Sequence, residues 1–275
     1  MAARERVLLE AGPARGTVAP ALGGRIASLT VHGNELLVTA TAAQLAGEDP
    51  HGWGCFPMAP WAGRMRDGRF TFAGRQHHLP RNLAPHAIHG TAVGRAWDVA
   101  RSSETAVELE VGLGPAWPFA GRVTQRIELS ADRLRCTLAV HATDDEMPAE
   151  LGWHPWFAKP TRAELGFAAM YRLDHSGIPT GALTEEIPPG PWDDCFVGPI
   201  RPPQLDVAGV RVTISSDCDH WVVYDRPAHA TCVEPQSGPP DAINFDPRPL
   251  APGESLERWM EISWERLPVE HPAPA

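Results

Sequence analysis

The sequence predicts an all-β fold, a large antiparallel β-sandwich, and three observations lead to this prediction. Short apolar stretches alternate with turn residues along almost the whole chain. Apolar residues do not keep a helical period over any long segment. The chain has 275 residues, which is long for an average domain but common for one all-β unit. We therefore expect a single domain over residues 1–275, in which two sheets pack face to face.

The N-terminal part predicts strands that tight turns connect. Residues 17–40 contain three strand-like stretches, and Gly33-Asn34 between the last two is a hairpin signal. Residues 41–53 predict a short helix that Gly47 and Pro50 end.

The segment 54–97 alternates short apolar stretches with turns that carry arginine and histidine. It includes turns at 60–64 and 66–69 and the sequence His-Ala-Ile-His-Gly at 86–90. This pattern is typical of short strands whose loops present polar side chains on one surface. Together with two later motifs, it predicts that four residues converge on one pocket: Arg64, His89, His154 and Glu234.

The remaining segments differ in how clearly they predict strands. Four strands are expected in 97–143, although Gln125 interrupts the apolar face of one of them. Residues 144–203 are rich in proline and glycine but also in aromatic residues, so we expect long ordered loops packed on a sheet. Further strands are expected after residue 209, and the alternation in 255–267 favours a strand over a helix there.

Composition and charge exclude several classes of function. The net charge is −10 and basic residues are scattered, so we expect no nucleic-acid partner. Apolar runs are too short to span a membrane, and the first residues lack the apolar stretch of a signal peptide. Five cysteines without a Cys-x-x-Cys pair indicate free buried thiols and a cytoplasmic location.

Two residues in the later motifs are candidates for acid–base chemistry. His154 lies in Gly-Trp-His-Pro-Trp-Phe, and imidazole can hold and deliver a proton near neutral pH. Glu234 ends an apolar stretch, where a carboxylate is costly unless it is paired or used. The structural alternatives are a packed core histidine and an exposed glutamate at a strand end.

Other candidates have weaker signals. The histidines at 77, 78, 86 and 89 raise the hypothesis of a metal site, but they lack the spacing of a recognised zinc site, so we expect no metal and no cofactor. Tryptophan faces suit the C–H face of a pyranose ring. The sequence contains neither a glycine-rich phosphate loop nor a Gly-x-Ser-x-Gly motif, so nothing indicates covalent catalysis.

Taken in order, these motifs resemble those of the aldose 1-epimerases, or galactose mutarotase-like proteins. The resemblance covers most of the chain and rests on short pieces at 22–29, 63–70, 82–90, 152–157, 193–196, 234–244 and 250–254. Thr91, Trp156 and Asp194 depart from the pattern of the sugar-specific members, which leaves the substrate open.

The resemblance implies a large β-sandwich and a cofactor-free interconversion of the α and β anomers of a free aldohexose. It implies that Glu234 is the general base, that His154 is the general acid and that His89 lies near the ring oxygen. The expected substrate-binding residues are Arg64, Asp193, His86, Trp61 and Trp156. We expect Glu234 to hold the pKa of His154 up. The sequence does not distinguish a monomer from a homodimer.

Three alternatives remain. A hexose-6-phosphate mutarotase would need a basic phosphate pocket, for which five arginines are available: Arg66, Arg69, Arg75, Arg81 and Arg95. A non-catalytic sugar-binding or sensing protein could use the same sandwich, although binding alone does not require both an acid and a base. A metal-dependent β-barrel enzyme is the last alternative.

Overall fold

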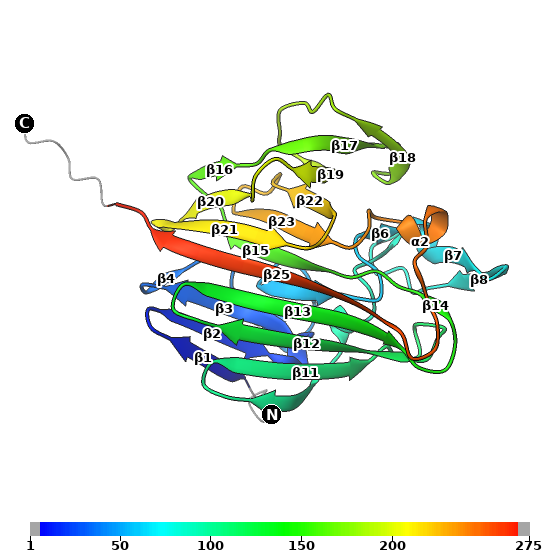
Figure 1. The fold of residues 1–275 in the computed structure, drawn as a ribbon, viewed down its shortest axis with the longest axis horizontal. Coiled ribbons are helices and arrows are strands. Elements are labelled where there is room, and N and C mark those ends of the chain that lie inside the picture. Colours follow the sequence, from blue (N-terminus) through cyan, green and yellow to red (C-terminus); the bar gives the residue numbers. More distant parts are fainter. Residues whose placement is uncertain (1–5, 269–275) are drawn as a thin grey trace, which may run out of the picture.

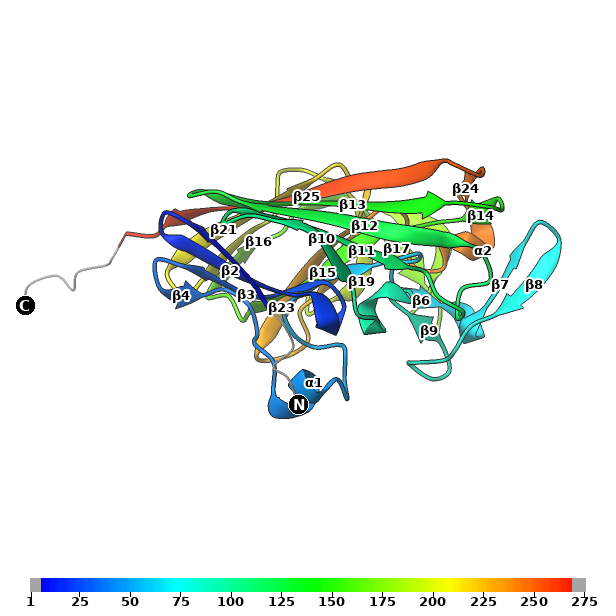
Figure 2. The ribbon, with the colours of Figure 1, turned by 90° about the horizontal axis from the view of Figure 1, so that it is seen from below.

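The computed structural model describes residues 6–268, and most of its strands form two large antiparallel sheets that face each other (Figures 1 and 2). In the first sheet the strand order is β1-β2-β3-β5-β15-β23-β22-β19-β17-β18, and β4 pairs with β3. The bounds of its strands are β1 Val7–Ala11, β2 Ala14–Ala19, β3 Arg25–Val31, β4 Asn34–Glu35, β5 Cys55–Met58, β15 Gly152–Ala158, β17 Phe167–Leu173, β18 Pro179–Thr184, β19 Asp193–Pro199, β22 His220–Tyr224 and β23 Ala230–Gln236.

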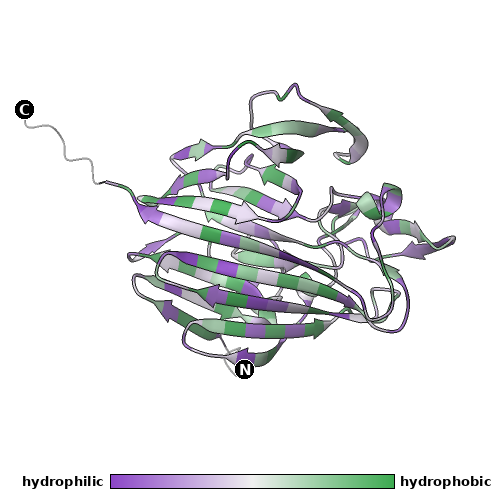
Figure 3. Cartoon of the chain, in the orientation of Figure 1, coloured by the Kyte–Doolittle hydropathy of each residue, from purple (hydrophilic) through white to green (hydrophobic). Residues whose placement is uncertain are grey.

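The second sheet has the order β10-β11-β12-β13-β25-β21-β20-β16. Its strands are β10 Asp98–Ser102, β11 Ala106–Gly112, β12 Gly121–Leu129, β13 Arg133–Ala142, β16 Arg162–Glu164, β20 Gln204–Val207, β21 Val210–Ser216 and β25 Ser255–Arg266. Apolar and polar residues alternate along these strands (Figure 3), as expected for a sheet with one face on the core.

Small elements connect the two sheets. Three two-stranded ribbons pair β6 Arg64–Met65 with β9 Ala87–Ile88, β7 Arg69–Phe72 with β8 Arg75–His78, and β14 Met147–Pro148 with β24 Pro249–Leu250. The helices are short: α1 Ala42–Ala46, α2 Ala242–Phe245, and the 3₁₀ turns η1 Pro20–Leu22, η2 Arg66–Gly68 and η3 Ala92–Gly94. The prediction of an all-β sandwich is therefore confirmed. Within the described residues, no helix is long and apolar enough to cross a membrane.

Most of the predicted elements are present. The hairpin near Gly33-Asn34 joins β3 to β4, and the helix in 41–53 is α1, which Thr41 caps through a capping box and Gly47 ends in a left-handed conformation. The C-terminal strand is β25, the central partner of β13 and β21 in the second sheet. All five cysteines are free and buried, as predicted.

The prediction of long loops in 144–203 is wrong. This segment contributes β14 to β19, and four of these strands, β15, β17, β18 and β19, belong to the first sheet. Proline and glycine separate short strands here, and aromatic contacts between strands compensate for the weak pattern, because Phe167 stacks on Phe196 at 4.7 Å between ring centroids. Composition alone could not separate these strands from ordered loops.

A continuous apolar core fills the space between the sheets. Leu109, Ile127 and Leu138 contribute to it from the second sheet, and Trp153 and Val233 from the first. Gln125, which interrupts the apolar pattern of β12, is buried in this core. Its amide donates to the carbonyl of Gly24 at 2.8 Å and accepts from Trp153 Nε1 at 3.3 Å, so the buried polar group is satisfied.

Strands β15 and β23 are buried on both faces, and this places the candidate catalytic residues. Because side chains alternate along a strand, Trp153 and Val233 point into the core between the sheets. His154 and Glu234, each one position further, point to the opposite face of the first sheet. The loops of 41–97 cover that face and close a pocket over it.

Candidate active site

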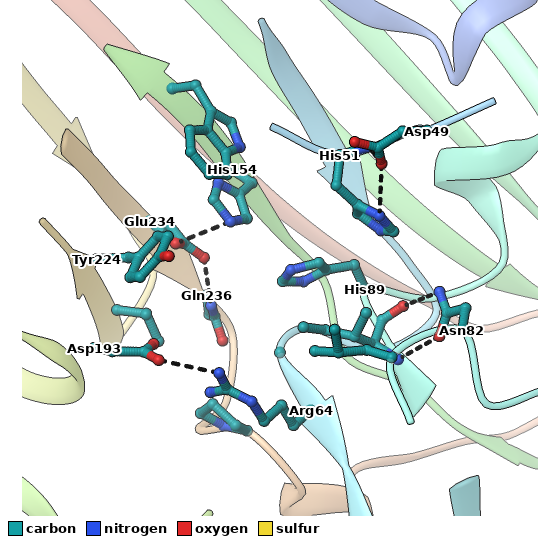
Figure 4. Close-up of a pocket in the computed structure, with 16 residues that line it drawn as sticks. Asp49, His51, Arg64, Asn82, His89, His154, Asp193, Tyr224, Glu234 and Gln236 are labelled. Carbon is teal, nitrogen blue, oxygen red and sulfur yellow. Dashed lines mark hydrogen bonds and ion pairs between the residues drawn. The ribbon is translucent and has the colours of Figure 1, made fainter. Parts of the chain in front are cut away.

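A cavity of about 460 Å³ lies on this face of the first sheet, and Figure 4 shows the side chains that line it. This volume is within the range of small-molecule sites. Its wall contains all four residues that the sequence predicted to converge: Arg64, His89, His154 and Glu234.

Glu234 and His154 face each other at the base of the cavity (Figure 4). His154 Nε2 lies 3.2 Å from Glu234 Oε1, and the two side chains are only 6% and 2% exposed. Gln236 donates to the other carboxyl oxygen of Glu234 at 3.3 Å. The pairing of β15 with β23 produces this contact, because Gly152 pairs with Gln236 and Trp156 pairs with Cys232 on either side of it.

Aromatic side chains hold the His154 ring in place. Its centroid lies 4.8 Å from that of Phe56 on β5 and 5.1 Å from that of Trp156, whose ring is parallel to it. His89 packs edge-on at 5.0 Å. The imidazole is therefore oriented by packing as well as by Glu234, which is a requirement for precise proton transfer.

Burial opposes charge on both members of the pair. It raises the pKa of Glu234 well above 4.5, with a further contribution from the negative charge of Asp193. It lowers the pKa of His154 well below 6.5, and the positive charges of His51 and Arg25 act in the same direction. The expectation that Glu234 holds the pKa of His154 up is therefore wrong, because desolvation of the enclosed imidazolium outweighs the attraction.

Arg64 and Asp193 form a second polar pair in the cavity. Arg64, on β6, donates from Nη2 to Asp193 Oδ2 at 3.0 Å, and Asp193 begins β19. The side chains are 26% and 20% exposed, so both reach the space that a ligand would occupy. Such a pair offers fixed donors and acceptors for hydroxyl groups.

His89 is held on a constrained backbone. It has a φ of +62°, which is rare for a residue other than glycine and is typical of functional sites. Asn82 fixes the preceding residue through two hydrogen bonds, since its amide donates to Ile88 O at 3.0 Å and its oxygen accepts from Ile88 N at 2.8 Å. Gly90 follows with a φ of +77°, and a Cβ there would lie 1.9 Å from the carbonyl oxygen of Ala59.

The structure places two of the predicted substrate-binding residues away from the cavity. Trp61 is buried and stacks on Trp117 at 5.6 Å between ring centroids. His86 is also buried, and its Nδ1 accepts a hydrogen bond from the Asp67 amide at 3.1 Å. Both support the loops around the cavity. Trp156, by contrast, does line it.

Sequence reasoning missed several residues of the cavity wall. Tyr224 lies at the end of β22, and Gln236 belongs to the same strand face as Glu234. Asp49 and His51 come from the loop after α1, where only the turn signals Pro50 and Gly52 pointed to an irregular segment. No motif marked them, because their position depends on how this loop folds over the first sheet.

Few side chains in the described part of the chain lie close enough together to bind a metal ion. One group of three possible ligands is found there, His154, Cys232 and Glu234, whose donor atoms lie within 4.8 Å of one another. The histidines at 77, 78, 86 and 89 do not form such a group within residues 6–268. His77 stacks on Phe70 instead.

The fold and the pocket together define a large two-sheet β-sandwich with a cavity of about 460 Å³ on one outer face. A family model described as aldose 1-epimerase matches residues 5–189, about two thirds of the chain. The chain therefore belongs to the aldose 1-epimerase family, and the predicted membership is confirmed.

Known relatives and structures agree with this assignment. The uncharacterised protein YphB of Escherichia coli K12 is 28% identical over an alignment of 245 residues, and the match covers 78% of this chain and 84% of YphB. A galactose mutarotase-like protein from Clostridium acetobutylicum has a similar fold, with a TM-score of 0.84, 20% identity and coverage of 95% of each chain. Galactose 1-epimerase from Lactobacillus acidophilus gives a TM-score of 0.80 at 15% identity, covering 95% of this chain and 94% of that one. These two structural similarities concern the fold.

Proposed function

We propose that the protein is a mutarotase that interconverts the α and β anomers of a free aldohexose. The observation that carries the proposal is the buried pair of Glu234 and His154, 3.2 Å apart at the base of a sugar-sized cavity. The ring oxygen and the 1-hydroxyl of an aldose are both bonded to C1, so an acid and a base that act on them have to lie next to each other. Membership of the aldose 1-epimerase family supports the same reaction.

In the proposed mechanism, Glu234 accepts the proton of the 1-hydroxyl while His154 donates a proton to the ring oxygen. The C1–O5 bond breaks, giving the open-chain aldehyde, and rotation about C1–C2 exposes the other face of the carbonyl. Ring closure forms the C1–O5 bond again, and both proton transfers reverse. His89, packed edge-on to His154, would contact the ring oxygen, and Arg64 with Asp193 would bind ring hydroxyls.

The pKa changes in the pocket suit this chemistry. A carboxylate whose pKa is raised by burial is a stronger base, and an imidazolium whose pKa is lowered is a stronger acid. One proton shared by the pair can lie on either residue without changing the total charge. The pair is thus set to exchange protons with the sugar in both directions.

The charges of the cavity favour a free sugar over a sugar phosphate. Arg64 is the one arginine among the described residues that line it, and it already pairs with Asp193. Asp49 and Glu234 add further acidic groups. The five arginines considered for a phosphate pocket lie outside the cavity wall, and Arg66, for example, pairs with Asp174 at 2.7 Å. Two negative charges on a phosphate would have no matched partner here.

Polarimetry tests this proposal directly. Freshly dissolved α-glucose and α-galactose are followed to anomeric equilibrium with and without the protein, and hexose 6-phosphates are followed in parallel by exchange NMR. We expect acceleration with a free aldose that falls by about 10²–10⁴-fold in Glu234→Gln and in His154→Asn.

Two outcomes would redirect the proposal. A preference for 6-phosphates would favour a sugar-phosphate mutarotase instead. Sugar binding without acceleration, measured by calorimetry, would leave a sugar-binding or sensing protein on the same sandwich.

A further inference from the structure

Two polar residues on the far wall of the cavity have no part in the proposed proton transfers. Asp49 and His51 belong to the segment 41–54, which lies outside both sheets and begins with α1 (Figure 2). They face the cavity from the side opposite Glu234, Tyr224 and Asp193 (Figure 4). A sugar that places C1 at Glu234 and His154 would turn its remote hydroxyls toward this wall.

The His51 ring has a defined orientation. Its Nδ1 lies 3.5 Å from Asp49 Oδ1, which also accepts the backbone N–H of His51 at 2.8 Å. Gln44 of α1 donates to the His51 carbonyl at 2.8 Å. The ring centroid lies 5.7 Å from that of His89 and 5.9 Å from that of Phe56.

The other ring nitrogen of His51 is available to a ligand. His51 Nε2 is buried and has no hydrogen-bond partner among the described residues. Buried polar atoms are usually paired, so an unpaired one on the wall of a cavity indicates a missing partner. With a proton on Nδ1 toward Asp49, neutral His51 presents Nε2 as an acceptor, which matches a hydroxyl donor.

The segment that carries these residues is fixed from behind. Arg25 of β3 is 1% exposed, and its guanidinium donates to Pro50 O at 2.6 Å and to Trp53 O at 3.1 Å. It also lies 4.1 Å above the ring of Trp53. Asp49 and His51 are thus held in place before a ligand arrives, which reduces the entropy lost on binding.

Burial outweighs the charged groups that surround His51 and favours its neutral form. Asp49 lies on its own segment, Arg25 approaches from β3, and His89 and His154 line the same cavity. Burial is the main cause that lowers the pKa of His51, the charge of Asp49 opposes it, and that of Arg25 acts in the same direction.

We propose that Asp49 and His51 form a hydroxyl-recognition subsite that decides which aldose the protein accepts. His51 Nε2 accepts a hydrogen bond from a sugar hydroxyl across the ring from C1, and Asp49 orients the imidazole. This inference rests on the proposed function, because it places C1 at Glu234 and His154. Segment 41–54, outside the sandwich, would then determine the specificity for the aldose.

A cycle that combines protein variants with deoxy sugars tests the subsite. Binding of the preferred aldose and of its 3-deoxy, 4-deoxy and 6-deoxy analogues is measured by isothermal titration calorimetry for the wild type and for His51→Ala. We expect the variant to lose about 3- to 10-fold in affinity for the parent sugar, the value of one neutral hydrogen bond. For one deoxy sugar, the one that lacks the contacted hydroxyl, wild type and variant should bind equally.

Two further variants complete the test. Asp49→Asn keeps the shape of an exposed side chain, so it reports on the subsite even if His51→Ala does not fold, and it should show a smaller loss with the same hydroxyl dependence. His78→Ala, at an exposed position of β8 outside the cavity, should bind all sugars as the wild type does.

An equal loss for the parent and every deoxy sugar, or no loss at all, would overturn the subsite while leaving the mutarotase proposal intact. A wild-type protein that binds no aldose would overturn both.

Discussion

Glu234 and His154 show how burial can prepare two ordinary side chains for proton transfer. In water, a glutamate and a histidine are both mostly charged between about pH 4.3 and 6.5. Here both lie under protein, so the pKa of Glu234 is raised and that of His154 is lowered. The neutral and charged forms of the pair therefore come closer in energy, which is useful for a reaction that runs equally in both directions.

The pH dependence of kcat/KM should report on this pair as one unit. Activity requires one proton on the pair, so we expect a bell-shaped profile. Because burial lowers the pKa of His154, the acidic limb should lie below pH 6.5, and because burial raises the pKa of Glu234, the alkaline limb should lie above pH 4.5. Polarimetric rates across about pH 4 to 9 measure both limbs. A flat profile over that range would contradict the acid–base mechanism.

Glu150 is a second buried carboxyl group, and we expect it to make the stability of the folded protein depend on pH. Burial raises the pKa of Glu150 well above 4.5, the charge of Asp241 adds to this, and the Ala62 amide opposes it. A raised pKa in the folded state favours folding below pH 4.5, and this contribution is lost as the pH rises. Glu150→Gln should therefore be more stable than the wild type at pH 8, with a smaller gain at pH 5.

Urea unfolding at the two pH values measures this difference. Glu104→Gln, at an exposed position, controls for the loss of one negative charge. A gain in stability that does not grow with pH would show that Glu150 is not the titrating group.

At the scale of elements, the alternation of side chains explains how the active site and the core share the same strands. β15 and β23 are covered on both faces, so nearly all of their residues are buried, the polar ones included. Along each strand, every second side chain packs between the sheets, and the side chains in between face the cavity. A shift of one residue in the register of β15 would exchange Trp153 with His154, so the register that builds the core also positions the acid.

The loop that carries His89 depends on the glycine that follows it. Gly90→Ala would place a methyl group against the Ala59 carbonyl in a left-handed conformation, so we expect a loss of about 3 kcal/mol in the free energy of unfolding. Gly74→Ala is a matched control, because Gly74 has a φ of +75° and open space around it, and about 1 kcal/mol should be lost there. Urea denaturation compares the two. Equal losses would show that the contact with Ala59 is relieved at little cost.

At the scale of the molecule, Gln125 joins the two sheets through their common core. Gln125→Leu would keep the volume but leave the Gly24 carbonyl and Trp153 Nε1 without this partner, so we expect a loss of about 2 kcal/mol. Arg122→Gln, an exposed change on the same strand, should stay within about 0.5 kcal/mol. Thermal and urea unfolding measure both variants. An unchanged stability of Gln125→Leu would mean that water or a local shift satisfies the two groups.

The sequence by itself determined the fold class and the chemical centre of this protein. Strand patterns before residue 143 and after residue 209 were sufficient for the sandwich, because alternation of apolar residues reflects burial on one face. Short motifs indicated the four residues that line one cavity, Arg64, His89, His154 and Glu234, although their roles remain predictions. The strands of segment 144–203 were not predicted, because proline and glycine separate them into short pieces and β14, β15 and β16 pair only with strands outside the segment.

Only the tertiary structure decided what surrounds these residues. The enclosure of Glu234 and His154 reverses the expected pKa change of the histidine, since desolvation depends on every element packed around the pair. Trp61 and His86 are buried and do not line the cavity, whereas Asp49 and His51 reach it from a loop without a recognisable motif. Local patterns record which face of a strand is buried, but contacts between distant segments decide which side chains meet in the pocket.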